Sequence, residues 1–98
     1  MPRLVLLSSE ATRQLQKMRA RDRSLLREAL QIHLADADAT IETRHRFRLR
    51  RPSSHADYEL RIEKWRVFYR VVKNRVQVAL IGRKQGNALI VDGRRFTL

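Results

Sequence analysis

Hydrophobic residues in the middle of the chain alternate with polar ones as they do in a β-hairpin. Two apolar runs, residues 58–62 and 65–72, flank the polar pair Glu63-Lys64, which suits a two-residue turn. Residues that pair across such a turn share one face of the sheet. The face that we expect to be the core side carries Leu60, Ile62, Trp65, Val67, Tyr69 and Val71. The opposite, open face is expected to carry Arg61, Arg66, Phe68 and Arg70.

The N-terminal third of the chain predicts a strand followed by two helices. Residues 3–7 form an apolar run with the length of a short buried strand, and Ser8 or Ser9 can cap the helix that follows. Asp22 is a good N-cap for a second helix. The apolar stripe of the first helix consists of Ala11, Leu15 and Met18. The buried side of the second helix is expected to contain Leu25, Leu26, Ala29, Leu30 and His33, the last as a structural histidine.

The C-terminal half predicts further antiparallel strands. Residues 36–43 lose the helical period and indicate a loop, and residues 44–51 alternate as a strand. The pairs at 73–74 and 92–93 indicate tight turns, the second with the Asp-Gly signature of a C-terminal hairpin. The strand between them should place Val76, Val78 and Leu80 on the core face. We therefore expect one α+β domain over residues 1–98, a mostly antiparallel sheet in the order β-α-α-β-β-β-β with a helical hairpin on one face.

Positive charge is concentrated in the second part of the chain. The sequence has 22 Lys and Arg residues against 10 Asp and Glu, a net charge of +12. Residues 1–43 hold seven basic and six acidic residues, whereas residues 44–98 hold fifteen basic and four acidic ones. So basic a segment indicates a polyanionic partner, most often nucleic acid and less often an acidic protein or a membrane surface. The excess of arginine over lysine favours bidentate phosphate contacts and stacking on bases.

The most basic stretch, residues 44–51, predicts a surface for a phosphate backbone. Phe47 and Leu49 fall on one face of the expected strand, and the other face carries Arg44, Arg46, Arg48 and Arg50. The same charges would also protect an edge strand from aggregation, and both roles can hold together. Phe68 on the neighbouring open face could stack a base, or it could pack under the aliphatic parts of the arginines beside it.

Composition narrows the possible chemistry. The chain has no cysteine, which excludes disulfides, thiolate metal sites and cysteine nucleophiles. It has no Asp and Glu cluster suited to a divalent metal, and its three histidines do not support a Ser-His-Asp set. We therefore expect no metal and no cofactor. The apolar run at residues 4–7 is too short for a signal peptide or a membrane span, so a soluble cytoplasmic protein without a membrane partner is expected.

The run ELRIEKWRVFYRV at residues 59–71, followed by ALIGRKQGN at residues 79–87, resembles the motifs of the bacterial RelE/ParE toxins. The resemblance covers nearly the whole chain and implies a RelE-like fold. It also implies a toxin of a type II toxin–antitoxin pair, with a cognate antitoxin partner whose complex sets the oligomeric state. RelE-like members enter the ribosome and cut mRNA there, whereas ParE-like members inhibit DNA gyrase.

The resemblance assigns roles to particular residues. Arg61 and Arg66 match the two arginines of the central motif, and Lys84 matches a basic position in a loop expected over residues 82–87. Metal-free RNA cleavage needs charge stabilisation on the phosphoryl oxygens, a base for the 2′-hydroxyl and an acid for the leaving oxygen. We expect these three residues to supply the charge. The candidates for proton transfer are His55, placed first, and His45, Tyr58 and Glu63. Arg70 and Arg83 are expected to add to the RNA-binding surface.

The chain departs from the best-known RelE toxins at two places. Those members carry lysines on the strand that enters the central motif, where this chain has Asp57 and Glu59. They also carry a tyrosine after the basic loop, where this chain has residues 88–90, Ala-Leu-Ile. Three functions therefore remain open at this point: ribosome-dependent mRNA cleavage, gyrase inhibition, and non-catalytic binding to RNA or the ribosome.

Overall fold

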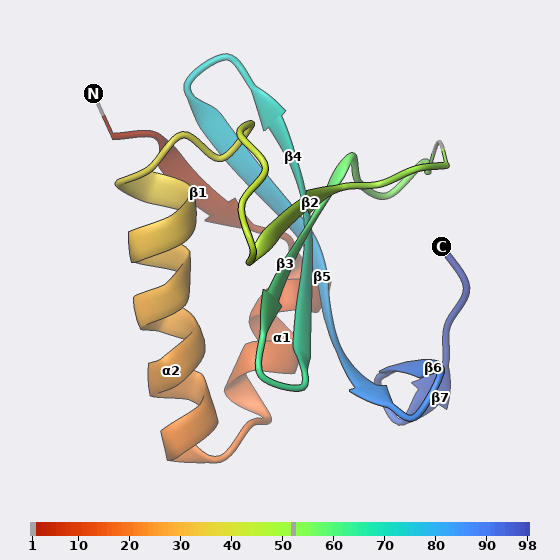
Figure 1. Cartoon of the computed structure of the whole chain (residues 1–98). Coiled ribbons are helices and arrows are strands. Elements are labelled where there is room, and N and C mark those ends of the chain that lie inside the picture. The colour runs from red at the N-terminus through yellow and green to blue at the C-terminus, as the bar shows by residue number, and fades with distance from the viewer. Residues whose placement is uncertain (1, 52) are drawn as a thin grey trace.

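One twisted sheet organises the fold (Figure 1). The computed structural model describes residues 2–51 and 53–98, and over these residues seven strands form the sheet in the order β2-β3-β4-β5-β6-β7, with β1 beside β5. The pairing of β1 with β5 is parallel and the other pairings are antiparallel. The elements are β1 (Leu4–Leu7), α1 (Ser9–Gln16), α2 (Ala20–Leu30), the π-helical η1 (Gln31–Ala35), β2 (Arg46–Arg48), β3 (Tyr58–Ile62), β4 (Trp65–Val72), β5 (Arg75–Gln85), β6 (Ala88–Val91) and β7 (Arg94–Arg95). The predicted α+β arrangement is confirmed.

The tight turns follow the local sequence. Two-residue turns at 63–64, 73–74 and 92–93 join neighbouring strands as predicted. Asp92 and Gly93 have φ values of 54° and 78°, which a type I′ turn requires. The predicted basic loop over residues 82–87 is wrong, because β5 continues to Gln85 and only Gly86-Asn87 forms the turn.

The two helices begin differently. The side-chain oxygen of Ser8 accepts a hydrogen bond from the Ala11 amide at 3.0 Å and so caps α1, as predicted. The prediction that Asp22 is the N-cap of α2 is wrong. The Arg23 amide donates to the Arg19 carbonyl at 2.9 Å, so the helix has already begun where Asp22 stands. Asp22 lies in the first turn, where its charge still suits the positive end of the helix dipole.

The main core lies between the sheet and the helices, on the predicted face. Its sheet residues are Tyr58, Leu60, Ile62, Val67, Tyr69, Val76, Val78 and Ile81, and its helical residues are Ala11, Leu15, Leu26, Ala29, Leu30 and Leu34. Trp65 and Val71 pack against this cluster while half-buried. Burial of these side chains is the main favourable term that holds the helical hairpin on the sheet.

A β-bulge exchanges two residues between the faces of β5. Phe68 pairs with Leu80, whereas the next residue of β4, Tyr69, pairs with Val78, so β5 contains one extra residue. Leu80 therefore lies on the face away from the helices and Ile81 lies in the main core. The prediction that Leu80 faces the core is wrong, since simple alternation cannot register the extra residue.

The C-terminal hairpin covers part of the sheet face that was expected to be open. Phe68, Leu80, Ala56 and Val91 form a second hydrophobic cluster there. The partly buried residues that pack against it are Leu49, Ala79, Leu89 and Phe96. This face remains exposed at its two ends, near the 63–64 turn, where Arg61 lies, and near the 73–74 turn, where Val72 and Arg75 lie.

Close approach of the hairpin depends on Gly82. A Cβ at this position would lie 2.8 Å from the Ile90 carbonyl oxygen and 2.9 Å from Cγ2 of Val91. Because backbone would have to move, we expect Gly82→Ala to lower the free energy of unfolding by about 1–3 kcal/mol. Urea unfolding followed by circular dichroism measures this loss. An unchanged midpoint would show that the hairpin does not pack on β5 as described.

Candidate nucleic-acid interface

Cationic residues of three strands meet on the exposed part of the face away from the helices. Arg61 of β3 pairs with Arg66 of β4, which in turn pairs with Gly82 of β5. Paired residues share a face, and Lys84 lies two residues beyond Gly82 on the same strand and therefore on the same side. The structure thus places Arg61, Arg66 and Lys84, the three residues expected to contact phosphate, on one face.

Both arginines are held in position by their neighbours. The Nε of Arg61 donates to Oε1 of Glu59 at 2.6 Å, and its guanidinium carbon lies 4.1 Å from the centre of the Phe47 ring. The Nη1 of Arg66 donates to the carbonyl oxygens of Glu63 at 2.8 Å and of Trp65 at 2.9 Å. Burial lowers the pKa of Arg66, an effect opposed by the charge of Glu59 and reinforced by Arg61. This fixed geometry is suited to binding an anion with little reorganisation.

Sequence reasoning missed Glu59 and Phe47 as members of this site. Glu59 pairs with Phe68 on one side and with Phe47 on the other, so all three lie on the face away from the helices. The alternation in residues 44–51 does not say which set of side chains faces the helices. The pairing of Arg46 with Leu60 settles that question and puts the aromatic ring of Phe47 beside Arg61.

The predicted ladder of exposed arginines does not form, because Arg46 is buried. Arg46 is 6% exposed and lies on the helix side of the sheet with Leu60. Its Nε donates to the Ile41 carbonyl at 2.8 Å and its Nη1 to the His33 carbonyl at 2.9 Å. His33 belongs to η1, whose carboxyl end carries partial negative charge. Arg46 therefore fastens the loop and the helix end to β2, and its prediction as an RNA contact is wrong.

The other arginines of residues 44–51 do not share one surface in register. Arg48 donates to the Tyr58 hydroxyl at 3.0 Å, and its guanidinium lies 5.4 Å from the centre of that ring. Arg44 and Arg50 are exposed but lie outside β2. These three side chains contribute positive charge to one edge of the sheet without forming a single row.

Three further residues that are predicted to contact RNA are buried, bonded to a loop or on the opposite face. Phe68 is on the expected face but is only 1% exposed, so its prediction as a stacking platform is wrong. Arg70 donates to Oδ2 of Asp57 at 3.2 Å and to the Ser53 carbonyl at 3.1 Å, so it ties the preceding loop to β4. Arg83 pairs with Trp65 and lines a cleft beside α1, on the opposite face from Lys84.

The structure does not bring His55 to the arginine pair. His55 is exposed, lies edge-on to Phe96 at 5.4 Å between ring centres, and borders a depression with Arg70. Arg70 stands four residues along β4 from Arg66, a distance of roughly 13 Å at 3.3 Å per residue. His45 is nearer to the pair, since its Nδ1 lies 3.2 Å from the Arg61 carbonyl oxygen. Residues 52–55, Pro-Ser-Ser-His, predict a turn into the central hairpin, and Pro52 lies outside the described residues.

Comparison with solved structures finds a similar fold. No protein-family model matches the chain, and no curated protein matches it. A chain of the toxin–antitoxin complex RelBE2 from Mycobacterium tuberculosis is similar to it in structure, with a TM-score of 0.62 and 22% sequence identity. The match covers 86% of this chain and 100% of that chain. The two chains share a fold. The expected RelE-like fold is thereby confirmed.

Within the part of the chain that the structure describes, no helix is long and apolar enough to cross a membrane.

In this RelE-like fold, two histidines that are distant in sequence lie together. The ring centres of His33 and His45 are 4.9 Å apart. Burial lowers the pKa of His33, and the charges of His45 and Arg46 act in the same direction. In the unfolded chain His33 has its ordinary pKa of about 6.5. As the pH falls through this value, the unfolded chain therefore binds more protons than the folded chain.

Stability should therefore fall as the pH is lowered from about 7 through the ordinary histidine pKa of about 6.5. We expect His33→Gln to flatten this dependence, which urea unfolding at a series of pH values measures. The matched control is His55→Gln, which replaces an exposed histidine and should keep the wild-type slope. Equal slopes for all three proteins would show that the histidine pair does not couple protonation to folding.

Proposed function

We propose that the chain is the toxin of a type II toxin–antitoxin pair and inhibits translation by ribosome-dependent, metal-independent cleavage of mRNA. The observation that carries the proposal is the placement of Arg61, Arg66 and Lys84 on one exposed face. The net charge of +12 supports a polyanionic partner. The fold shared with a chain of the RelBE2 toxin–antitoxin complex supports the toxin assignment.

The cluster supplies the charges that metal-free cleavage needs. In that reaction the ribose 2′-oxygen attacks the adjacent phosphorus, the 5′-oxygen leaves, and negative charge develops on the phosphoryl oxygens. Arg61 and Arg66 would hold those oxygens, with Lys84 at the next strand. Arginine itself is a poor proton carrier, since its pKa exceeds about 12. Glu59 accepts a hydrogen bond from the Arg61 guanidinium and is the group beside it that can accept and donate protons, whereas His45 contacts only the main-chain carbonyl of Arg61.

Neutralisation by an antitoxin follows from the same surface. An acidic segment of the antitoxin would cover the arginine face or its rim and keep RNA away. The product of the reading frame beside the toxin gene should therefore co-purify with the chain as a stable complex. A chain that purifies alone when the two are co-expressed would argue against the toxin–antitoxin assignment.

A purified translation reaction tests the proposed activity. Adding the chain should stop protein synthesis and cut the mRNA, but only when ribosomes are present. Stopped synthesis with intact mRNA would replace cleavage by non-catalytic occupancy of the ribosome. An unaffected translation reaction would move attention to DNA gyrase, whose supercoiling activity can be measured with the same preparation.

A further inference from the structure

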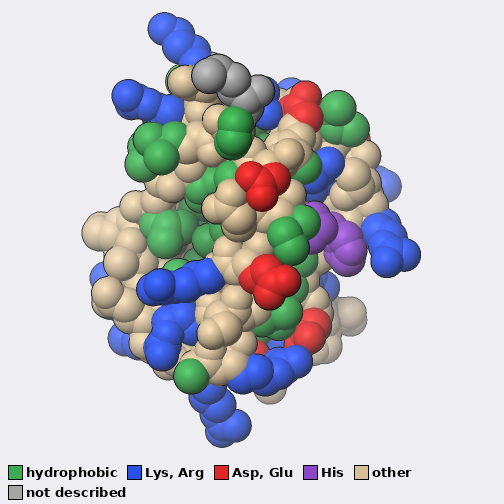
Figure 2. Space-filling view, turned by 90° about the vertical axis from the view of Figure 1, so that its left-hand side faces the viewer, with side chains coloured by type: hydrophobic (Ala, Val, Ile, Leu, Met, Phe, Trp, Pro, Cys, Tyr) green, Lys and Arg blue, Asp and Glu red, His purple; other side chains and the backbone are tan. Residues whose placement is uncertain are grey.

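Two histidines from distant parts of the chain meet where the helical layer reaches the edge strand β2. His33 belongs to η1, and His45 directly precedes β2. Both residues are half-buried, and their ring centres are 4.9 Å apart. Figure 2 faces the side of the molecule on which α2 lies and shows histidine side-chain atoms at the surface. A half-buried pair of imidazoles is within reach of a small solute.

The geometry of the pair suits two imidazoles on one metal ion. A zinc–nitrogen bond is about 2.0–2.1 Å long and a ring centre lies roughly 1.2 Å beyond the nitrogen, so two imidazoles at a tetrahedral angle have ring centres about 5 Å apart. The planes of the two rings are inclined by 53°. Planes that cross allow the in-plane lone pairs of both rings to point at one position, which parallel stacked rings cannot do. The spacing and the tilt therefore both suit a shared ion.

The hydrogen bond of the His45 ring leaves its other nitrogen for a ligand. Nδ1 of His45 lies 3.2 Å from the Arg61 carbonyl oxygen. Because a carbonyl oxygen only accepts, Nδ1 carries the proton and donates it, and Nε2 keeps its lone pair. Metal-binding histidines commonly donate their second ring N–H to a carbonyl in this way, which fixes the tautomer and the orientation of the ring.

Other residues hold both histidines in place. The His33 carbonyl accepts a hydrogen bond from Nη1 of Arg46 at 2.9 Å, and the His45 amide donates to Oγ1 of Thr43 at 3.1 Å. The segment η1 is a π-helix, a rare conformation that is frequent at functional sites. Ligands whose backbones are already fixed lose little freedom when they bind an ion.

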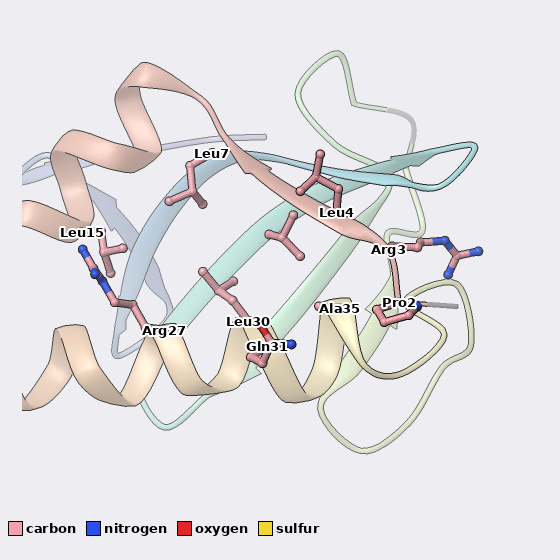
Figure 3. A pocket seen from close by; sticks show the side chains of 10 residues that line it. Pro2, Arg3, Leu4, Leu7, Leu15, Arg27, Leu30, Gln31 and Ala35 are labelled. Carbon is pink, nitrogen blue, oxygen red and sulfur yellow. The ribbon is translucent and has the colours of Figure 1, made fainter.

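The first strand holds η1 from its other side. The Arg3 amide donates to the Ala35 carbonyl at 3.1 Å, and β1 lies opposite Leu30 and Ala35 across a pocket (Figure 3). The prediction that residues 3–7 are a buried strand is wrong, because Leu4 is 58% exposed. The strand nevertheless fixes the end of the helical segment that carries the first histidine of the pair.

We propose that His33 and His45 together bind a divalent transition-metal ion, with water in its remaining positions. Imidazole suits Zn²⁺, Cu²⁺ and Ni²⁺, whereas Mg²⁺ and Ca²⁺ prefer oxygen ligands. In the part of the chain that the structure describes, no group of three or more His, Cys, Asp or Glu residues could hold a metal, so water has to complete the site. The expectation of no metal followed from spacing along the sequence. The spacing of these two histidines matches no metal motif, and the pair arises only where η1 packs beside β2.

The ion would stand apart from the proposed RNA-cleaving cluster. His45 contacts Arg61 only at its main-chain carbonyl, whereas the Arg61 guanidinium lies over the ring of Phe47. The ion would link the end of the helical layer to the edge of the sheet and take no part in metal-independent cleavage. Because it binds both histidines only when the chain is folded, it would raise the free energy of unfolding. This inference does not rest on the proposed function.

Titration of the chain, without an affinity tag, with ZnCl₂ at about pH 7.5, where an ordinary imidazole is mostly neutral, tests the site. In NMR spectra the ring signals of His33 and His45 should shift together and saturate at one equivalent, while those of the exposed His55 stay in place. In calorimetry, His33→Gln and His45→Gln should each weaken Zn²⁺ binding at least tenfold. The matched control, His55→Gln, should change the affinity less than twofold. Saturating Zn²⁺ should raise the melting temperature of the wild type by about 4 °C or more.

Three results would overturn the inference. Equal shifts of all three histidines would show adventitious binding of the metal only, and a shift of one ring of the pair alone would show that the two do not share an ion. Unmoved ring signals of His33 and His45 at a large excess of Zn²⁺ would exclude the site. The NMR titration uses the wild-type chain, so it decides the question even where circular dichroism shows that a variant fails to fold.

Discussion

Arg46→Met should lower the free energy of unfolding by about 2–4 kcal/mol, a large part of the stability of a small domain. The substitution keeps an apolar stem but removes two charge-assisted hydrogen bonds, to the carbonyl groups of Ile41 and His33. The His33 carbonyl in η1 and the Ile41 carbonyl in the following loop would both lose the guanidinium that satisfies them. Urea unfolding measures the loss, and RNA binding by the folded variant should stay close to that of the wild type.

The matched control for this prediction is Arg44→Met, in the same basic stretch. Arg44 is exposed, so its loss should change stability by less than about 0.5 kcal/mol. Equal, small changes in both variants would mean that Arg46 is a surface residue like its neighbours, and the description of the loop anchor would have to be abandoned.

Arg66→Ala should reduce the rate of mRNA cleavage on the ribosome by about 10²–10³-fold under single-turnover conditions. The prediction follows from the position of Arg66, which is held by two backbone carbonyls and pairs with Arg61 on the exposed face. Loss of a residue that acts on the phosphoryl oxygens lowers the cleavage rate of the bound complex. Loss of a residue that only attracts RNA lowers the affinity instead.

Arg75→Ala provides the comparison for this rate. Arg75 is an exposed arginine of the sheet that lies at the far end of β5 from Gly82. It should keep the wild-type rate at saturating ribosome concentration. A loss of affinity in Arg66→Ala without a loss of rate would favour binding by occupancy over cleavage.

The parts of the fold that depend on neighbouring residues could be predicted from the sequence. The turn at 63–64 lies between two alternating apolar runs, and the serine that caps α1 directly precedes an apolar helical stripe. These signals are local, so the strands and helices that they define appear where the pattern puts them. The same signals place Arg61 and Arg66 on one face, since residues opposite each other across a hairpin share a side.

The parts that depend on distant pairing could not be predicted. The burial of Phe68 requires the C-terminal hairpin to fold back over β4 and β5, which the alternation of β4 does not encode. The exchange of Leu80 and Ile81 requires the bulge, and the burial of Arg46 requires the register of β2 against β3. For Phe68 and Arg46 the alternation is correct and a contact remote in the chain decides which side is covered, whereas for Leu80 the bulge breaks the alternation itself.

Mapping of mRNA 5′ ends in a translation reaction, with Lys84→Ala and Arg83→Ala compared side by side, tests the central claim most directly. These neighbours on β5 are both basic and lie on opposite faces of the sheet. The proposed RNA-cleaving face, which contains Arg61, Arg66 and Lys84, predicts that new 5′ ends decrease strongly in Lys84→Ala and persist at the wild-type level in Arg83→Ala. Loss of the ends in Arg83→Ala with their retention in Lys84→Ala would place the functional surface on the helix side and contradict the account.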